Sequence, residues 1–123
     1  MKTTQIKIGT LEFEARLAGK DYIPLEKRLK KSLFNTIMGY KVDDENLNLP
    51  TLGEMTVILS QVCKTPNVRE RDIANAVENY MENGGTSYEL YGQIMELLSD
   101  SGFFGKTEES GTSSEDEQVE NLI

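Results

Sequence analysis

The sequence predicts a mostly helical α+β fold, in which an N-terminal β-hairpin packs on about four helices and a disordered acidic tail follows. Apolar residues alternate with polar ones near the N-terminus, which is typical of a half-buried hairpin. Further along they recur every three or four residues, the spacing of an amphipathic helix. The last segment is acidic and poor in apolar residues, so we expect a folded body, residues 1–104, and a tail, residues 105–123.

The first element is predicted to be the hairpin. Residues 4–8 and 11–17 both alternate, and the Gly9-Thr10 link suits a type II′ turn in which Gly9 has a positive φ. The apolar face of this hairpin comprises Ile6, Ile8, Leu11, Phe13, Ala15 and Leu17. Because an isolated hairpin is only marginally stable in water, helices are expected to cover this face.

The first helix is predicted from about Asp21 to Met38. Its buried stripe recurs every four residues, as Leu25, Leu29, Leu33 and Ile37, with Phe34 and Met38 widening it. Pro24 fits only near the first turn, because proline has no N–H to donate in a helix interior.

A basic cluster, Lys27-Arg28-x-Lys30-Lys31, falls on the outer side of this helix. Glu26 and Lys30 are spaced for an ion pair between positions i and i+4, which favours a solvated face over an anion-binding patch. A contact with the acidic tail of a neighbouring copy is a further alternative.

Two more helices are expected after the polar link of residues 41–48. Thr51 and Glu54 have the spacing of a capping box, so a second helix should run from Leu52 to about Cys63. After Thr65-Pro66-Asn67 a third helix is expected from about Arg69 to Met81, and Gly84-Gly85 should terminate it.

A fourth helix is predicted from a second capping box, Thr86-Ser-Tyr-Glu89, to about Leu98. Leu90 and Leu97 broaden its apolar stripe, so the helix is either deeply buried or partly exposed. The candidate partner-binding residues are therefore those of this helix and of the aromatic pair after it: Tyr88, Tyr91, Met95, Leu98, Phe103 and Phe104. For the aromatic side chains, packing in the core and at the helix end is the alternative.

The net charge of −8 is uneven along the chain. Residues 105–123 hold six acids against one base, a balance of −5, which leaves −3 for residues 1–104. An acidic chain repels the phosphate backbone, so nucleic acid is not an expected partner. With one cysteine, no secretion signal and no apolar run long enough to cross a bilayer, the sequence predicts a cytoplasmic protein that does not enter a membrane.

The sequence predicts no enzyme activity, cofactor or metal site. It contains no histidine, which removes the commonest general base and metal ligand, and it has no phosphate-binding glycine loop. Asp43, Asp44 and Glu45 lie in the polar link, where nothing in the sequence would shift a carboxyl pKa. Cys63 is expected to be a small buried apolar residue rather than a nucleophile.

Several segments, in order, carry a family resemblance. They are the hairpin ending in Ala15-Arg-Leu17, then Leu25-Glu-Lys-Arg-Leu29-Lys-Lys, Asn48-Leu-Pro-Thr-Leu52, Ile58-Leu59 in a capped helix, and Glu82-Asn-Gly-Gly-Thr86 before the last helix. This order resembles the tail assembly chaperones of long-tailed phages that infect Gram-positive bacteria, the G-type product encoded before the tape measure gene. The chain departs from that pattern at Ala18, where a threonine cap is frequent, at Lys30, where a glycine is common, and at Pro24.

The resemblance implies a non-catalytic protein of the host cytoplasm that self-associates and coats the tape measure protein until tail tube subunits polymerise around it. It also implies a frameshift-extended form that recruits the tube protein. Two other functions remain open: a small acidic adaptor or inhibitor that acts through its tail, and a structural tail or head-completion protein.

Overall fold

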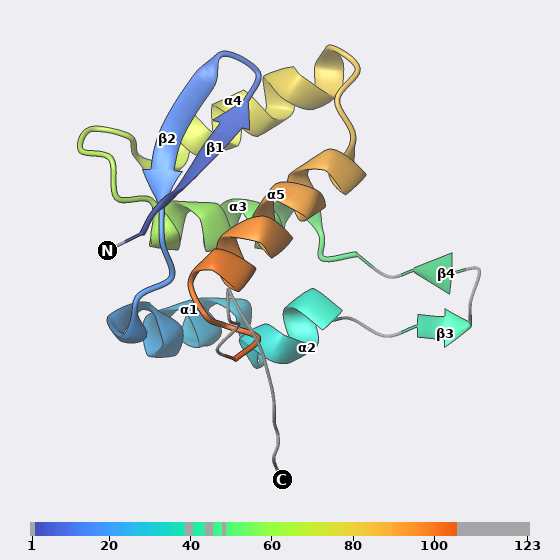
Figure 1. Cartoon of the computed structure of the whole chain (residues 1–123). Coiled ribbons are helices and arrows are strands. Elements are labelled where there is room, and N and C mark those ends of the chain that lie inside the picture. The colour runs from blue at the N-terminus through green and yellow to red at the C-terminus, as the bar shows by residue number, and fades with distance from the viewer. Residues whose placement is uncertain (1, 39–40, 44–45, 48, 106–123) are drawn as a thin grey trace, which may run out of the picture.

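The computed structural model describes residues 2–38, 41–43, 46–47 and 49–105 and confirms the predicted class, a mostly helical α+β fold with an N-terminal hairpin (Figure 1). The hairpin consists of β1 (Thr4–Ile8) and β2 (Leu11–Ala15), and a single 3-10 turn (Gly19–Asp21) follows it. The described helices are α1 (Tyr22–Leu29), α2 (Leu33–Met38), α3 (Leu52–Val62), α4 (Glu70–Glu82) and α5 (Ser87–Asp100). Two short strands, β3 (Lys41–Asp43) and β4 (Asn46–Leu47), pair in the link between α2 and α3.

The N-terminal hairpin forms as predicted. Ile8 pairs with Leu11 across the two-residue link, and φ is positive at Gly9 (+63°) but not at Thr10, as a type II′ turn requires. The strands bury their alternate residues, including Ile6 and Phe13, which face each other in the register. The predicted apolar face is therefore the face that packs on the helices.

Other parts of the chain form hydrogen bonds to both edges of the hairpin. On the β2 edge, the Arg16 N–H donates to the Val62 carbonyl (3.0 Å) and the Lys64 N–H donates to the Glu14 carbonyl (2.8 Å). On the β1 edge, the side-chain amide of Gln93 accepts from the Lys7 N–H (2.8 Å) and donates to the Lys7 carbonyl (2.7 Å). Because unpaired edge groups are templates for further strand addition, these contacts reduce that hazard.

The prediction of one helix from Asp21 to Met38 is wrong, because the chain breaks between α1 and α2. Lys30 ends α1 with a left-handed φ of +64°, and its N–H donates to the Glu26 carbonyl at 2.8 Å. The apolar spacing of four residues continues across the break, so the hydrophobic pattern by itself does not reveal it.

Side chains cap the start of α2. The Ser32 hydroxyl accepts from the Asn35 N–H at 3.0 Å, and the Glu26 carboxylate accepts from the Leu33 N–H at 2.8 Å. These acceptors satisfy N–H groups that the first turn of a helix leaves without partners. Since Glu26 serves as a cap, the predicted ion pair between Glu26 and Lys30 does not form.

The remaining helices begin and end close to their predicted limits. At α3 the capping box is complete: the Thr51 hydroxyl accepts from the Glu54 N–H, and the Glu54 carboxylate accepts from the Thr51 N–H, both at 3.0 Å. At α5 only half of the predicted box forms. The Thr86 hydroxyl accepts from the Glu89 N–H (3.2 Å), but the Glu89 carboxylate instead accepts from the Tyr80 hydroxyl.

The turn between α4 and α5 explains its two glycines. Gly84 has a φ of +95°, and its N–H donates to the Met81 carbonyl, while the Gly85 N–H donates to the Tyr80 carbonyl. This hydrogen-bond pattern is a Schellman motif. A Cβ on Gly85 would lie 2.3 Å from the Tyr80 ring, so a larger residue there would collide with the ring.

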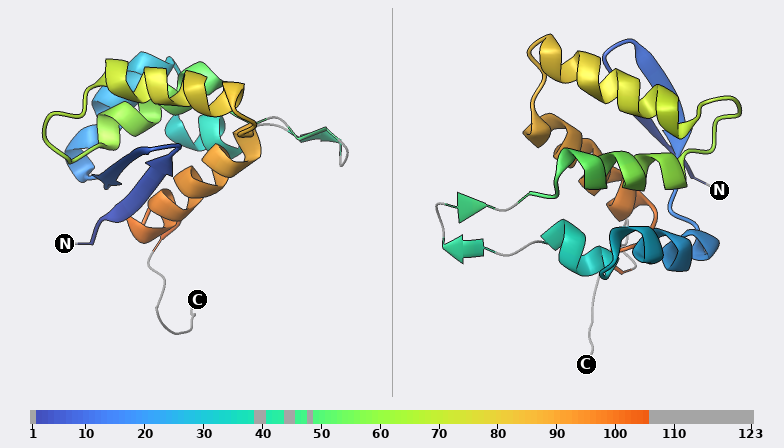
Figure 2. Two further views of the ribbon diagram at one scale, coloured as in Figure 1. Left: turned by 90° about the horizontal axis from the view of Figure 1, so that it is seen from above. Right: turned by 180° about the vertical axis from the view of Figure 1, so that it is seen from behind.

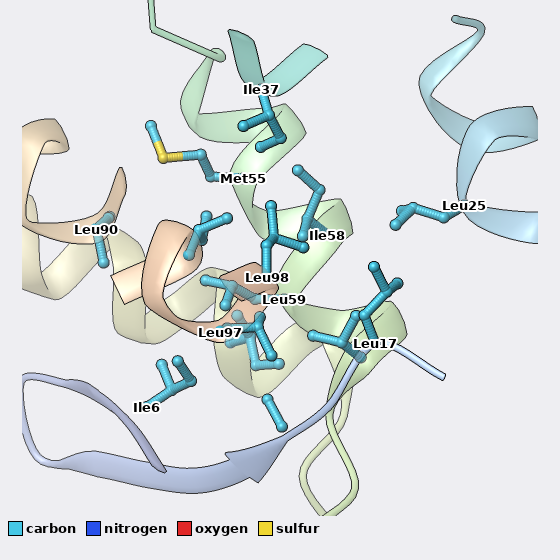
Figure 3. Packing of buried hydrophobic residues seen from close by; sticks show 14 of the residues in the cluster. Ile6, Leu17, Leu25, Ile37, Met55, Ile58, Leu59, Leu90, Leu97 and Leu98 are labelled. Atoms are coloured by element: carbon cyan, nitrogen blue, oxygen red, sulfur yellow. The ribbon is translucent and has the colours of Figure 1, made fainter. Parts of the chain in front are cut away.

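One hydrophobic core joins the hairpin to all five described α-helices. Helix α3 contacts α1, α4 and α5, and the hairpin packs on α4 and α5 through β1, an arrangement that Figure 2 shows from two further sides. Leu59 of α3 and Leu98 of α5, both completely buried, belong to this core and are labelled in Figure 3. The side chains that form this core are therefore not available to a partner.

Two predictions concern residues that the structure does not describe. The disordered acidic tail is predicted over residues 105–123, of which residues 106–123 lie outside the described residues. In the acidic group of the link, Asp43 belongs to β3, whereas Asp44 and Glu45 also lie outside the described residues.

Candidate partner surface

Helix α5 carries four of the predicted partner-binding residues, and the structure divides them. Leu98 is completely buried in the core, so its predicted role as an exposed contact is wrong. The buried face of α5 is centred on Leu90, Ile94, Leu97 and Leu98, and exposure increases around the helix from that face. Tyr91 and Met95 are half-buried at the side of it, and Tyr88 is exposed beyond them.

Tyr91 attaches α5 to α2. Its hydroxyl donates to the Ile37 carbonyl at 2.8 Å, near the C-terminal end of α2. Burial raises the pKa of Tyr91 above the ordinary tyrosine value, because the phenolate would lose its hydration. This side chain therefore holds two helices together, and only part of it is available to a partner.

The aromatic pair after α5 lies against α1. The N–H of Phe103 donates to the Leu98 carbonyl at 2.9 Å, which closes a second Schellman motif and turns the chain back. The Phe103 ring stacks on Tyr22 of α1 at 6.2 Å between centroids, and Phe104 meets Phe103 edge-on at 5.0 Å. Phe103 thus joins α5 to α1, while Phe104 remains exposed.

Five large apolar side chains are exposed on the described part of the molecule. Their exposed fractions are 70% for Ile23, 58% for Phe34, 44% for Met38, 65% for Tyr88 and 42% for Phe104. We call this set the exposed apolar residues. Tyr88 and Phe104 were predicted from the sequence, whereas Ile23 was not singled out.

The prediction for Phe34 and Met38 is wrong, because both were expected to widen the buried stripe of the first helix. Once Ser32 starts a new helix, Leu33, Thr36 and Ile37 form the buried face of α2. Phe34 and Met38 then lie one turn apart on its outer side. The sequence signal for this helix start is Ser32, because serine is a preferred N-cap residue. The apolar spacing that continues across the break hides this signal.

The basic cluster of α1 is partly used in ion pairs between helices. Arg28 reaches both carboxylate oxygens of Glu70 on α4 at 2.9 Å, and Lys31 lies 2.9 Å from Glu54 on α3. The hydrogen bond from Arg28 lowers the pKa of Glu70 more than burial raises it. The expectation of a purely solvated face therefore needs correction, since Arg28 ties α1 to α4 and Lys31, in the link after α1, pairs with α3.

The buried carboxylate of Asp21 has a structural environment. It accepts from the Ala18 N–H (2.9 Å), the Gln61 amide (3.3 Å) and the Lys64 ammonium (2.9 Å). Burial raises the pKa of Asp21, but these contacts, with the Lys64 hydrogen bond the largest, outweigh burial and lower it. The ionised carboxylate is thus fully partnered and fixes the start of α1 to the end of α3.

The described residues do not assemble a cluster of metal-ligating side chains. Within them, no group of three or more Asp, Glu or Cys side chains has the spacing of a metal site. Cys63 is half-buried rather than buried, and its thiol lies 3.7 Å from the Thr65 carbonyl. None of the described helices is both long and apolar enough to span a bilayer.

Comparison with known proteins gives one match. The family DUF6096, described as a family of unknown function, matches residues 1–122. No curated protein and no solved structure is significantly similar to the chain.

Proposed function

The chain belongs to DUF6096, and from the surface of this member we propose that it is a phage tail assembly chaperone. In this role it is non-catalytic, self-associates, and binds the tape measure protein in the host cytoplasm. It keeps that long helical client soluble until tail tube subunits polymerise around it. A frameshift-extended form of the chain recruits those subunits.

The observation that carries the proposal is the set of exposed apolar residues. Large apolar side chains that remain exposed can be covered by a partner, and four of these five lie on helices, with Phe34 and Met38 one turn apart on α2. A client rich in amphipathic helices presents apolar stripes that such side chains can cover. The net charge of −8 favours solubility of the resulting complex.

Local structure supports the family resemblance at two positions. Lys30, which stands where a glycine is common in these chaperones, has the left-handed φ that glycine adopts most easily. The Glu82-Asn-Gly-Gly-Thr86 segment forms the turn that separates α4 from α5. At Lys30 the residue type departs from that pattern, but the backbone has the conformation that a glycine there would adopt.

Co-expression tests the proposal directly. The tape measure protein encoded beside this chain's gene is produced alone or with the chain, and its soluble fraction is measured after centrifugation. We expect most of the tape measure protein to become soluble only with the chain present. An equal soluble fraction without the chain, or the absence of any tape measure gene nearby, would contradict the proposal.

Two further measurements separate this function from the alternatives. A chain that ends at residue 105 should still bind the client, because the proposed contacts lie in the folded body; an adaptor that acts through its acidic tail would lose function. Mass spectrometry of finished virions should find no copies of the chain. A structural tail or head-completion protein would instead be present in them.

A further inference from the structure

A groove between α3 and α4 is separate from the exposed apolar residues. Its volume is about 810 Å³, and the first two turns of α3 and one side of α4 line it. Leu52, Ala74, Val77 and Met81 give it an apolar lining, and Glu78 and Glu82 belong to its α4 side. Leu52, Ala74 and Met81 are only half-buried, so part of this apolar surface is open to a partner.

The shape of the groove suits a helix. Ala74, Val77 and Met81 are spaced by three and four residues, which places them in one line along α4. From Glu70 to Glu82, which both line the groove, α4 extends about 18 Å at 1.5 Å per residue. A partner helix of three to four turns with its own apolar stripe can lie along such a line.

The charge of the groove selects the partner. Three glutamates line it, and no lysine or arginine does. Glu70 is already paired with Arg28, whereas Glu78 and Glu82 are exposed and form no ion pair within the described residues. Arg71 lies on the same side of α4 as Glu78, but about 10 Å away along the helix axis, so it does not neutralise Glu78 directly.

Glu78 and Glu82 are unfavourable for α4 by itself. They are one turn apart, so their like charges repel, and they lie at the C-terminal end of the helix, where the helix dipole is also negative. Cations on a bound partner would relieve both effects.

We propose that the α3–α4 groove binds an amphipathic helix whose apolar stripe packs on Leu52, Ala74 and Met81 and whose flanking Lys or Arg residues face Glu78 and Glu82. This inference rests on the proposed function, because it specifies the kind of client segment that the chaperone holds. An acidic segment, including residues 106–123 of another copy, is excluded from the groove by like-charge repulsion.

Designed peptides test the groove without the client. The probe is a labelled peptide of about 15 residues in which leucines recur every three or four positions and lysines flank them. One control peptide has glutamates in place of the lysines, and another has the same composition with the leucines scattered. Fluorescence anisotropy at low ionic strength should show that the chain binds the probe at least tenfold more tightly than either control.

Substitutions then locate the binding. The double variant E78Q/E82Q should weaken probe binding about fivefold, because two solvent-exposed charge contacts are lost. The matched control E12Q/E96Q removes the same charge from exposed positions outside the groove and should change the affinity less than twofold. Amide chemical-shift changes on probe binding should centre on Leu52, Ala74 and Met81. Binding of the scattered-leucine control as tight as that of the probe would refute the proposal. Chemical-shift changes confined to residues outside the groove would refute it as well.

The client assay distinguishes the two proposals. If the parent chain solubilises the tape measure protein and E78Q/E82Q does so equally well, the groove inference fails while the proposed function stands. If the parent chain does not solubilise it but the probe still binds at the groove, the proposed function fails and the groove remains a site for a basic helix of another protein. Loss of solubilisation by E78Q/E82Q and not by E12Q/E96Q supports both.

Discussion

Lys30 pays a conformational cost at the end of α1. Its φ of +64° brings the Cβ close to the following carbonyl oxygen, which costs an L-residue about 1–2 kcal/mol. Glycine avoids this clash, although it loses somewhat more entropy on folding. We therefore expect K30G to raise the free energy of unfolding by about 0.5–1 kcal/mol in denaturant titrations.

Lys27 offers a matched control for this substitution. It is exposed on the same helix but has ordinary helical geometry, so K27G should lower the free energy of unfolding by about 1 kcal/mol. A stability loss in both variants would show that Lys30 does not hold a left-handed conformation in solution.

Asp21 makes the fold sensitive to acid. Its pKa is lower in the folded chain than in the unfolded one, so its contribution to stability is present above the unfolded value of about 3.9 and disappears as the pH falls through the folded pKa. D21N removes the charge-assisted hydrogen bond to Lys64 and should cost about 2 kcal/mol at pH 7. Between pH 5 and pH 2 the free energy of unfolding should fall less steeply for D21N than for the parent. Identical slopes would mean that Asp21 has the same pKa in the folded and the unfolded chain.

Gln93 contributes at the level of elements, because its amide acts as a partner for the free edge of β1. Q93L removes both hydrogen bonds to Lys7 and leaves the Lys7 N–H and carbonyl to solvent. We expect a loss of about 1 kcal/mol and faster hydrogen exchange at the Lys7 amide in NMR spectra. Q93E keeps an acceptor for the N–H but loses the donor, so its exchange rate should be intermediate. Unchanged exchange in Q93L would show that this edge is protected in some other way.

The elements that sequence analysis predicted correctly are those with a local chemical signal. The hairpin follows from the alternation and Gly9, and α3 follows from the capping box of Thr51 and Glu54. The break at Lys30 was missed, because a stripe with four-residue spacing continues through it and Lys30 is not a residue that usually ends a helix. Ser32 and Glu26 cap the start of α2. Glu26 accepts from the Leu33 N–H seven residues further on, and no short sequence motif describes that spacing.

The candidate surface was predictable only in part. In α5, periodicity identifies which residues share a side, but it does not identify which side the rest of the chain covers. Leu98 and Tyr88 were therefore both predicted to bind a partner, although Leu98 is buried in the core and Tyr88 is exposed. By its spacing Phe34 likewise belongs to the apolar stripe of the first predicted helix, although its side chain is exposed. The α3–α4 groove combines residues from two helices, so its existence depends on their packing and is not visible in either segment alone.

At the scale of the whole molecule, exposed apolar residues and net charge act in opposite directions on self-association. Burying Phe34 and Met38 between copies is favourable, at roughly 25 cal/mol per Å² of apolar surface. F34S/M38S should therefore shift the chain toward monomers in sedimentation velocity. N35S/N75S, at two exposed and uncharged positions of α2 and α4, should leave the distribution unchanged.

The net charge of −8 makes copies of the chain repel one another, and the salt concentration sets the distance over which this repulsion acts. The screening length falls from about 30 Å at 0.01 M salt to about 10 Å at 0.1 M, so repulsion between copies weakens while apolar contacts are little affected. The chain should form larger species as salt rises over this range. Because residues 106–123 hold −5 of the charge, a chain that ends at residue 105 should associate more strongly at low salt and respond less to added salt. Association that instead weakens with salt would show that ion pairs between copies, rather than the exposed apolar residues, hold the oligomer together.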